Sequence, residues 1–217
     1  MLQAFFTQQQ IPIGRDRFFE LLRRNKLLVR RLKRSVHTTN SNHHFRRYPN
    51  LAKDFMPLKA HELWVADITY IPLKHRFAYL FLITDAYSRK IVGFHVSDDM
   101  HHSDRGIQYC STEYVTLLQQ HNAMISMTQS GDPLENAIAE RVNGILKTEL
   151  IKSFYPNIET ASQHIFRCII IYNYKRRHSS LNWQIPADVH KQKGPQLRRW
   201  KNYIQQPKKK EVEMEKT

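Results

Sequence analysis

Three short runs of β-branched and aromatic residues, separated by two brief polar connections, most constrain what this chain can fold into. The runs cover residues 64–71, 77–84 and 90–96, and each has a composition typical of a strand. The connections, residues 72–76 and 85–89, are short enough for hairpins. Strands joined by hairpins are antiparallel, so this part of the chain predicts a three-stranded antiparallel meander.

Helical patterns dominate the sequence after the three runs. Apolar residues recur at helical spacing over about residues 135–152 and again over about 160–173. Ser111 is a suitable N-cap for a further helix that ends near residue 120. Residues 124–127 are apolar enough to predict one more short strand.

The first fifty residues predict a small basic module followed by a linker. A helix is expected after the Gly14 boundary, and a second short helix around residues 27–32. Two short helices joined by a tight turn are compatible with a helix-turn-helix unit. Many arginines fall here, and they predict either DNA contact or a solvated charged face: Arg15, Arg17, Arg23 and Arg24 are the candidates for DNA binding.

The charge balance favours a nucleic-acid partner. The chain has 34 Lys and Arg against 19 Asp and Glu, a net charge of +15, which indicates either nucleic acid or an anionic membrane face. No apolar run approaches the roughly 18 residues that span a bilayer, so DNA is favoured and no membrane association is expected. Cys110 and Cys168 lie on patterns typical of buried thiols, which fits a reducing cytoplasm.

Three carboxylates carry the chemistry that the sequence suggests. Asp67 lies inside an apolar strand pattern, Asp104 lies shortly before a glycine, and Glu140 lies on a predicted helix, with thirty-five residues between Asp104 and Glu140. Carboxylates that converge from different elements can hold Mg²⁺ or Mn²⁺ for phosphoryl transfer, with two ions acting together. Two other interpretations stay open: Asp67 could face water at a strand edge, and Asn136, Glu140 and Lys147 could form a solvated helix face.

Six stretches in order give the chain a resemblance to a known family. They read WVADITYI, YLFLITDAYSRKIVGF, HSDRGIQY, SMTQSGDPLENAIAE, LKTE and YNYKRRHSSLN, and they lie between about residues 63 and 190. The chain resembles the OrfB-type insertion-sequence transposases, whose catalytic core is similar to retroviral integrases. Such a core has a triad of two Asp and one Glu on a ribonuclease-H-like fold.

The resemblance implies both a site and its partners. It implies Asp67, Asp104 and Glu140 as the catalytic and metal-binding triad, with Mg²⁺ or Mn²⁺ as cofactor. It implies DNA as partner, both transposon ends and target, bound by a homo-oligomer, and an upstream reading frame as a further partner. The localisation expected is the bacterial cytoplasm, associated with the nucleoid. Contacts with DNA are implied for Arg105, Asn136, Lys147, Arg176 and Arg177, although Arg176 and Arg177 could equally solvate a helix end.

The implied fold is α/β: a ribonuclease-H-like integrase core with a mixed sheet and helices on both faces, over residues 57–190. The small helical module and linker occupy residues 1–50, and residues 191–217 form a basic tail that is expected to be partly disordered. The sequence therefore predicts three parts: an N-terminal module with its linker, a core and a tail.

One departure from the family pattern bears directly on the triad. In such a core a crossover helix and a fourth strand, parallel to the first, connect the third strand to the second acid. A parallel crossover needs a dozen or more residues, but residues 97–100 alone separate the third run from His101. The crossover helix and most of the fourth strand are therefore expected to be missing.

This deletion predicts a broken triad. An Asp104 that simply follows the third strand lies two strands from Asp67, roughly 10 Å away, so Asp67 is expected to be separated from the other two acids. One rearrangement could repair this, if residues 90–103 left the meander and paired on the other side of the first strand.

Two functions from different classes follow from the sequence. The first is a DNA transposase or integrase that catalyses metal-dependent strand cleavage and transfer, impaired in this copy, so that its enzymatic status is open. The second is a non-catalytic DNA-binding remnant that occupies transposon ends. A structure-specific nuclease of similar fold is disfavoured, because the GDPLENAIAE and YNYKRRHSSLN stretches match transposases.

Overall fold

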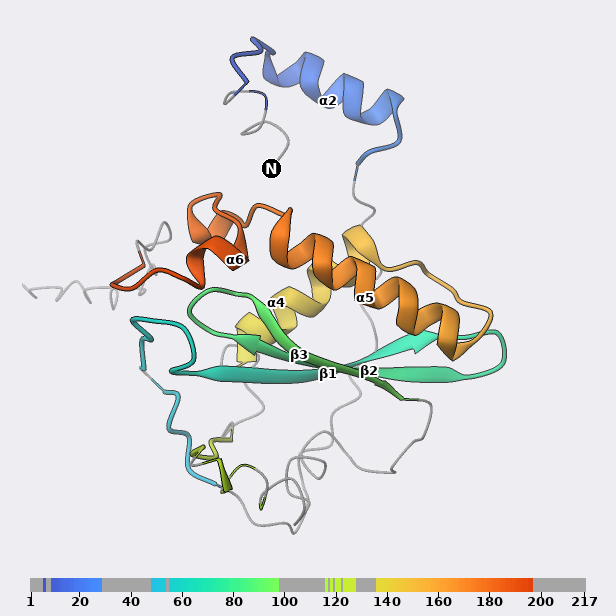
Figure 1. Ribbon diagram of the computed structural model, residues 1–217. Coiled ribbons are helices and arrows are strands. Elements are labelled where there is room, and N and C mark those ends of the chain that lie inside the picture. Colours follow the sequence, from blue (N-terminus) through green and yellow to red (C-terminus); the bar gives the residue numbers. More distant parts are fainter. Residues whose placement is uncertain are drawn as a thin grey trace, which may run out of the picture.

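The computed structural model describes residues 6, 9–28, 48–53, 55–97, 116, 118, 120–121, 123–127 and 136–196. Its strands are β1 (Trp64–Pro72), β2 (Phe77–Asp85) and β3 (Ile91–Ser97). Its helices are α2 (Arg15–Arg24), α4 (Ala137–Ile145), α5 (Ile158–Tyr174) and α6 (Pro186–Val189), with a π-helical turn η3 (Leu146–Leu150) and a short 3-10 turn η4 (Ser179–Leu181). Figure 1 shows α4 and α5 lying over the same face of the sheet.

The described sheet is the predicted antiparallel meander, in the order β1-β2-β3. In its register Asp67 lies opposite Leu82, and Leu82 lies opposite Phe94 on β3. The prediction of three hairpin-linked strands is confirmed. The rearrangement that would move residues 90–103 to the other side of β1 is wrong, because β3 pairs with β2.

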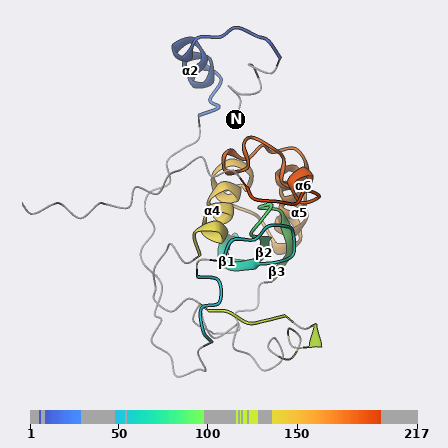
Figure 2. The ribbon, with the colours of Figure 1, turned by 90° about the vertical axis from the view of Figure 1, so that its left-hand side faces the viewer.

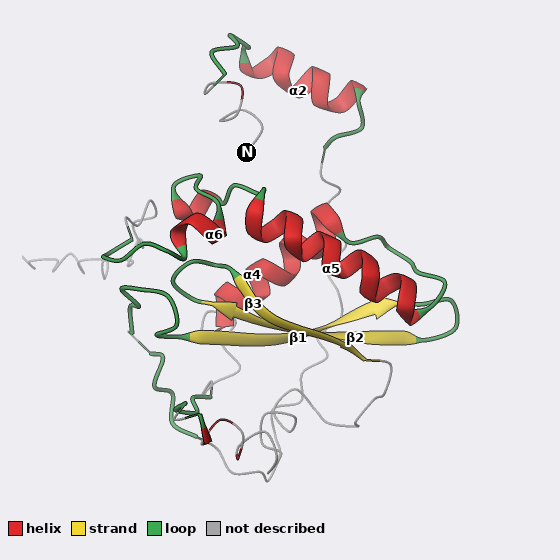
Figure 3. Ribbon diagram, in the orientation of Figure 1, coloured by secondary structure: helices red, strands yellow, loops and turns green. Residues whose placement is uncertain are grey.

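One face of this sheet is buried under the helices. Side chains alternate along a strand, so Asp67, Thr69 and Ile71 share a face, and Thr69 and Ile71 are buried on it. Helix α4 contacts β1 and β2, and α5 contacts β3. Figure 2 shows this arrangement end-on, and Figure 3 shows the same division into one sheet layer and one helical layer. Asp67 therefore points toward the helical layer.

The predicted helix over 135–152 is confirmed, but its last turn is not α-helical. Val142, Ile145 and Leu146 place its apolar side in the core. From Leu146 to Leu150 the backbone is π-helical, and the amide of Ile151 donates to the carbonyl of Leu146 at 2.8 Å. The helix then ends in an extended residue.

Helix α5 confirms the pattern predicted over 160–173. Its N-cap is Asn157, whose side chain accepts from the Thr160 amide at 2.9 Å, a standard way to satisfy a free helix donor. The core contacts of α5 recur on one face, and they are made by Ala161, Ile165, Ile169 and Tyr172. Near its end, buried Asn173 accepts from the Ile91 amide and donates to the Ile91 carbonyl, both at 2.9 Å. This pair of bonds fixes α5 to the start of β3.

In the N-terminal part of the chain, helix α2 confirms the first predicted helix. Phe18 is its buried residue, and the Phe6 ring packs edge-on against it at 5.9 Å. Arg15 lies over the Phe19 ring at 5.9 Å. The second predicted helix, around 27–32, lies mostly outside the described residues, and residues 27 and 28 are not helical.

Residues 124–127 do not form the predicted strand, so that prediction is wrong. They are irregular. The Met127 amide donates to the Pro49 carbonyl at 3.4 Å, and the Leu51 amide donates to Ser126 Oγ at 2.9 Å. This apolar segment therefore pairs with the chain that leads into the core, which periodicity alone does not reveal.

Several other predictions fall outside the described residues. Of the helix predicted over 111–120, residues 116, 118 and 120 are described and are helical. The missing crossover and fourth strand concern residues 98–104, and the disordered tail concerns residues after 196, both beyond the described ranges.

The chain after α5 folds back around a buried histidine, His178. Its side chain is 3% exposed, and its Nδ1 accepts from the Ser180 amide at 3.3 Å and contacts Ser180 Oγ at 2.9 Å. Burial, together with the positive charges of Arg176, Arg89 and Arg141, lowers the pKa of His178 to about 4. His178 is therefore neutral in the folded protein at neutral pH.

We expect this histidine to make the fold sensitive to acid. Because its pKa is lower in the folded state than the ordinary 6.5, its contribution to stability is complete above about pH 6.5 and is lost as pH falls toward 4. The free energy of unfolding should fall by about 3 kcal/mol over that window on its account. Urea unfolding at stepwise pH measures the loss. His178→Asn, whose side-chain oxygen can replace Nδ1, should remove this share of the pH dependence; an unchanged pH profile in the variant would contradict the assignment.

Candidate metal and DNA site

Asp67 is held by an amide rather than by a cation. Its side chain is half-buried on the inner face of β1, and Asn143 Nδ2 on α4 donates to Asp67 Oδ2 at 2.6 Å. Asn143 is itself only 5% exposed. A buried neutral donor orients the carboxylate without placing a positive charge beside it. The interpretation of Asp67 as a strand-edge residue facing water is wrong.

Helix α4 brings Glu140 beside this carboxylate. Residues three and four apart share a helix face, so Glu140 lies between Asn136 and Asn143. Asn143 bonds Asp67, and Asn136 Nδ2 donates to the Ala66 carbonyl at 3.1 Å. The polar face of α4 is thus seated on β1, with exposed Glu140 between its two attachment points. Glu140 thus lies one helical turn before the residue that bonds Asp67, and the separation predicted between the two carboxylates stays a prediction.

The third acid of the predicted triad, Asp104, and its neighbour Arg105 lie outside the described residues. Within the described ranges, no group of three or more His, Cys, Asp or Glu side chains could hold a metal ion. Asp67 and Glu140 are therefore the two acids of the predicted triad that the described residues contain, one on a strand and one on a helix.

Lys147 continues the polar face of α4 into η3. It lies seven residues after Glu140 and is half-buried. The contact between Lys147 and DNA that the family resemblance implies stays a prediction.

Arg176 and Arg177 are both engaged with the chain itself. Arg176 makes a two-pronged bond to Glu149, with Nε and Nη2 each 2.7 Å from a carboxylate oxygen, and the side chains are 12% and 23% exposed. Arg177 Nη1 donates to the Trp183 carbonyl at 3.2 Å. Of the two open interpretations, a solvated helix end does not describe Arg176, since it forms a partly buried ion pair between α5 and η3. Its contact with DNA stays a prediction.

The four arginines predicted on the N-terminal helix are all exposed. Arg15 and Arg17 lie in its first half, and Arg23 and Arg24 form its basic last turn. An exposed basic helix of this kind presents charge to solvent on several sides, and only Phe18 is buried.

Two functional features were missed by the sequence reasoning. The first is Asn143, although its spacing of three from Glu140 already places it on the same helix face. The second is a polar cluster around fully buried Asp85, where the sequence indicated only a hairpin connection. No simple sequence pattern identifies that cluster, because its partners come from residues 61, 88 and 190.

Two family models match the chain, and both describe an integrase core domain. One matches residues 57–101 and the other residues 121–186. Between them the two matches cover β1 to β3, α4 and α5. The stretch between the two matched ranges, residues 102–120, contains Asp104.

Curated relatives extend the similarity to most of the chain. The uncharacterized 31 kDa protein of insertion element IS600 from Shigella sonnei is 32% identical over 212 residues, covering 86% of this chain and 78% of that protein. The transposase of insertion sequence element IS904 from Lactococcus lactis is 35% identical over 169 residues, covering 66% of this chain and 67% of that protein.

Solved structures confirm the fold class. A chain of the simian T-cell lymphotropic virus intasome, solved in complex with PP2A regulatory subunit B56 gamma, superposes with a TM-score of 0.54 at 16% identity, covering 82% of this chain and 67% of that chain. The HTLV-2 integrase catalytic core domain in complex with magnesium superposes with a TM-score of 0.50 at 15% identity, covering 62% and 99%. The prediction of an integrase-like α/β core is confirmed.

The Arg176–Glu149 pair should stabilise the fold measurably. A partly buried, two-pronged ion pair is worth more than an exposed one, so we expect a coupling free energy of about 1–2 kcal/mol. Urea unfolding of Arg176→Ala, Glu149→Ala and the double variant gives this value. Lys175→Ala, at an exposed neighbouring position, is the matched control and should leave the free energy of unfolding unchanged. A coupling near zero would leave Arg176 available for a role on DNA alone.

Proposed function

This chain belongs to the insertion-sequence transposases that carry an integrase core domain, and we propose that it acts in DNA transposition through a carboxylate site built on Asp67, Asp104 and Glu140. The observation that supports this most directly is the attachment of α4 to β1. Asn143 bonds Asp67 at 2.6 Å one helical turn from Glu140, so acids seventy-three positions apart in sequence are held on facing elements.

The residues fit a hard divalent cation. Asp67 and Glu140 offer carboxylate oxygens, the ligand type that Mg²⁺ and Mn²⁺ prefer. The Asn143 amide occupies Asp67 Oδ2 and leaves Oδ1 for coordination. When bound, such ions activate a hydroxyl and stabilise the leaving oxygen of a phosphodiester. In this proposal Asp67 and Glu140 position the cations, and Asp104 completes the set.

The remaining predicted residues would contact DNA. Lys147 lies on the same helix face and would neutralise a backbone phosphate next to the carboxylates. The exposed arginines of α2 would hold transposon ends. Arg105, Asn136 and Arg177 keep the DNA contacts proposed from the family resemblance, and a homo-oligomer would hold two ends together in the cytoplasm.

The position of Asp104 decides how active the chain is. Because few residues separate β3 from Asp104, we propose a catalytic centre that assembles incompletely and cleaves more slowly than a core with a full crossover. The alternative is a DNA-binding remnant that catalyses no reaction. A measurement of metal binding distinguishes the two proposals.

We expect Glu140→Gln to abolish any Mn²⁺-dependent strand transfer on a matching transposon end. The substitution keeps the size of the side chain and removes the charge that a cation needs. Loss should be at least a hundredfold, measured on labelled DNA, with Glu159→Gln at the start of α5 as the matched control. Salt-sensitive DNA binding that survives in Glu140→Gln, with no activity in the unsubstituted protein, would instead support the remnant.

Asn143→Ala should weaken Mn²⁺ binding roughly tenfold or more, because groups that orient a ligand affect metal affinity nearly as strongly as the ligands do. Calorimetric titration of Mn²⁺ measures the change. Thr148→Ala, which removes a hydroxyl that bonds the Gly144 carbonyl at 2.7 Å in η3, is the control and should bind Mn²⁺ like the unsubstituted protein. Equal affinity in Asn143→Ala would contradict a positioning role.

A further inference from the structure

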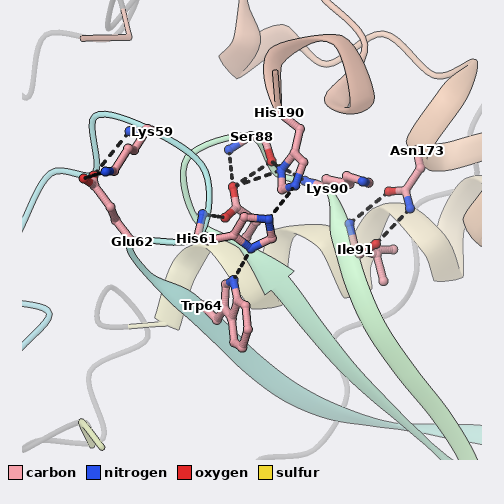
Figure 4. Close-up of polar contacts among 10 residues, drawn as sticks. Lys59, His61, Glu62, Trp64, Ser88, Lys90, Ile91, Asn173 and His190 are labelled. Carbon is pink, nitrogen blue, oxygen red and sulfur yellow. Dashed lines mark hydrogen bonds and ion pairs between the residues drawn. The ribbon is translucent and has the colours of Figure 1, made fainter. Parts of the chain in front are cut away.

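A pair of histidines joins the segment that enters the core to the segment that leaves it. His61 precedes β1 and His190 follows α6, and their Nε2 atoms are 3.1 Å apart (Figure 4). The rings meet edge to face with centroids 4.7 Å apart. Beside them the backbone of Lys59 bridges that of Lys193, and the Gly194 amide donates to the Leu58 carbonyl at 2.7 Å.

Buried Asp85 anchors both sides of this junction. Its carboxylate accepts from the His61 amide at 2.7 Å and from the Ser88 amide and hydroxyl at 2.8 and 2.7 Å. The His61 amide bond matters because His61 has a positive φ of 69°, a backbone conformation that is unfavourable for a residue with a side chain. Ser88 Oγ in turn lies 2.9 Å from His190 Nδ1.

The donors and acceptors of this network fit together in one way. The indole of Trp64 can only donate, and it lies 3.3 Å from His61 Nδ1, so that nitrogen carries no proton. Neutral His61 then has its proton on Nε2 and donates it to His190 Nε2. Neutral His190 has its own proton on Nδ1, which donates to Ser88 Oγ, and the Ser88 hydroxyl donates to Asp85.

This arrangement of hydrogen bonds cannot accommodate a second proton on either histidine ring. An imidazolium ring has two donors and no acceptor. A proton added to His190 sets its Nε2–H against the Nε2–H of His61, and a proton added to His61 sets its Nδ1–H against the Trp64 N–H. Each protonated form therefore lacks one of the hydrogen bonds in this network.

The charges around the pair favour the neutral form. Burial lowers the pKa of His190, the positive charge of Lys90 and the nearby His61 lower it further, and Asp85 opposes them. In the segment before β1, Lys59 and Glu62 form an exposed ion pair of their own at 4.0 Å. The folded-state pKa of His190 thus lies below 6.5, so the junction is intact above that pH and weakens as pH falls below it.

We propose that His61 and His190 form a proton-sensitive clasp, closed at neutral pH, that holds the entry and exit segments of the core together and releases them on acidification. The clasp is separate from the carboxylate site, and it depends on the two imidazoles, Trp64 and Ser88. Its opening frees the backbone pairing of residues 58–59 with 193–194, through which the N-terminal module and the C-terminal tail connect to the core.

The test follows the Gly194 amide in the full chain by NMR hydrogen exchange, from about pH 7.5 to about pH 5, the range in which histidines titrate. We expect its protection factor to fall roughly tenfold relative to the Ala86 amide, in step with the titration of the two histidine rings. A protection factor that stays constant over this range overturns the proposal.

Two substitutions distinguish a proton-sensitive clasp from a merely structural contact. Trp64→Phe removes the donor on His61 Nδ1 and should raise the pH midpoint of opening by roughly half a unit or more; Tyr70→Phe, on an exposed residue of the same strand, should not move it. His190→Gln should reduce the pH dependence of Gly194 exchange to the share that His61 contributes. A midpoint that Trp64→Phe leaves in place contradicts the proton order, and the exchange and ring titration of the unsubstituted chain decide the matter if a variant does not fold.

Discussion

The seating of α4 on β1 is the interaction on which both the fold and the proposed chemistry depend. A three-stranded sheet buries little on its own, and here Val142, Ile145 and Leu146 close its inner face from one side of the helix. Next to these apolar residues, the same helix carries the amides that bond Ala66 and Asp67. Core packing and carboxylate placement are therefore set by one rigid contact, so a change that shifts α4 for packing reasons also shifts Glu140.

The parts of the fold that follow local rules were predictable from sequence. Alternation and short connections identify the three strands, and helical spacing identifies α4 and α5 within two or three residues. The failures are of another kind. Residues 124–127 are as apolar as a strand, but they bond to Pro49 and Leu51, and such long-range pairing leaves no periodic signal.

The candidate site also has a part that the sequence predicts and a part that it does not. The strand pattern around Asp67 indicated that its side chain needs a partner, and the structure provides one in Asn143. The partner itself, Asn143, depends on how α4 is rotated over β1, which is a tertiary property. The expected separation of Asp67 from Asp104 follows from the order of strands, and it stays a prediction because Asp104 lies outside the described residues.

The π-helical turn at the end of α4 has a consequence for how this helix can vary. One residue corresponds to about 100° of rotation in an α-helix, so an insertion or deletion would normally turn everything that follows it. The turn Leu146–Leu150 already contains a bond of wider spacing, from the Ile151 amide to the Leu146 carbonyl. It acts as a local rotational offset: Glu149 is aimed at Arg176 independently of the direction in which Glu140 and Asn143 face. The sequences of α4 and η3 can therefore vary separately. The geometry of the carboxylate site limits changes in α4, and the ion pair with Arg176 limits changes in η3.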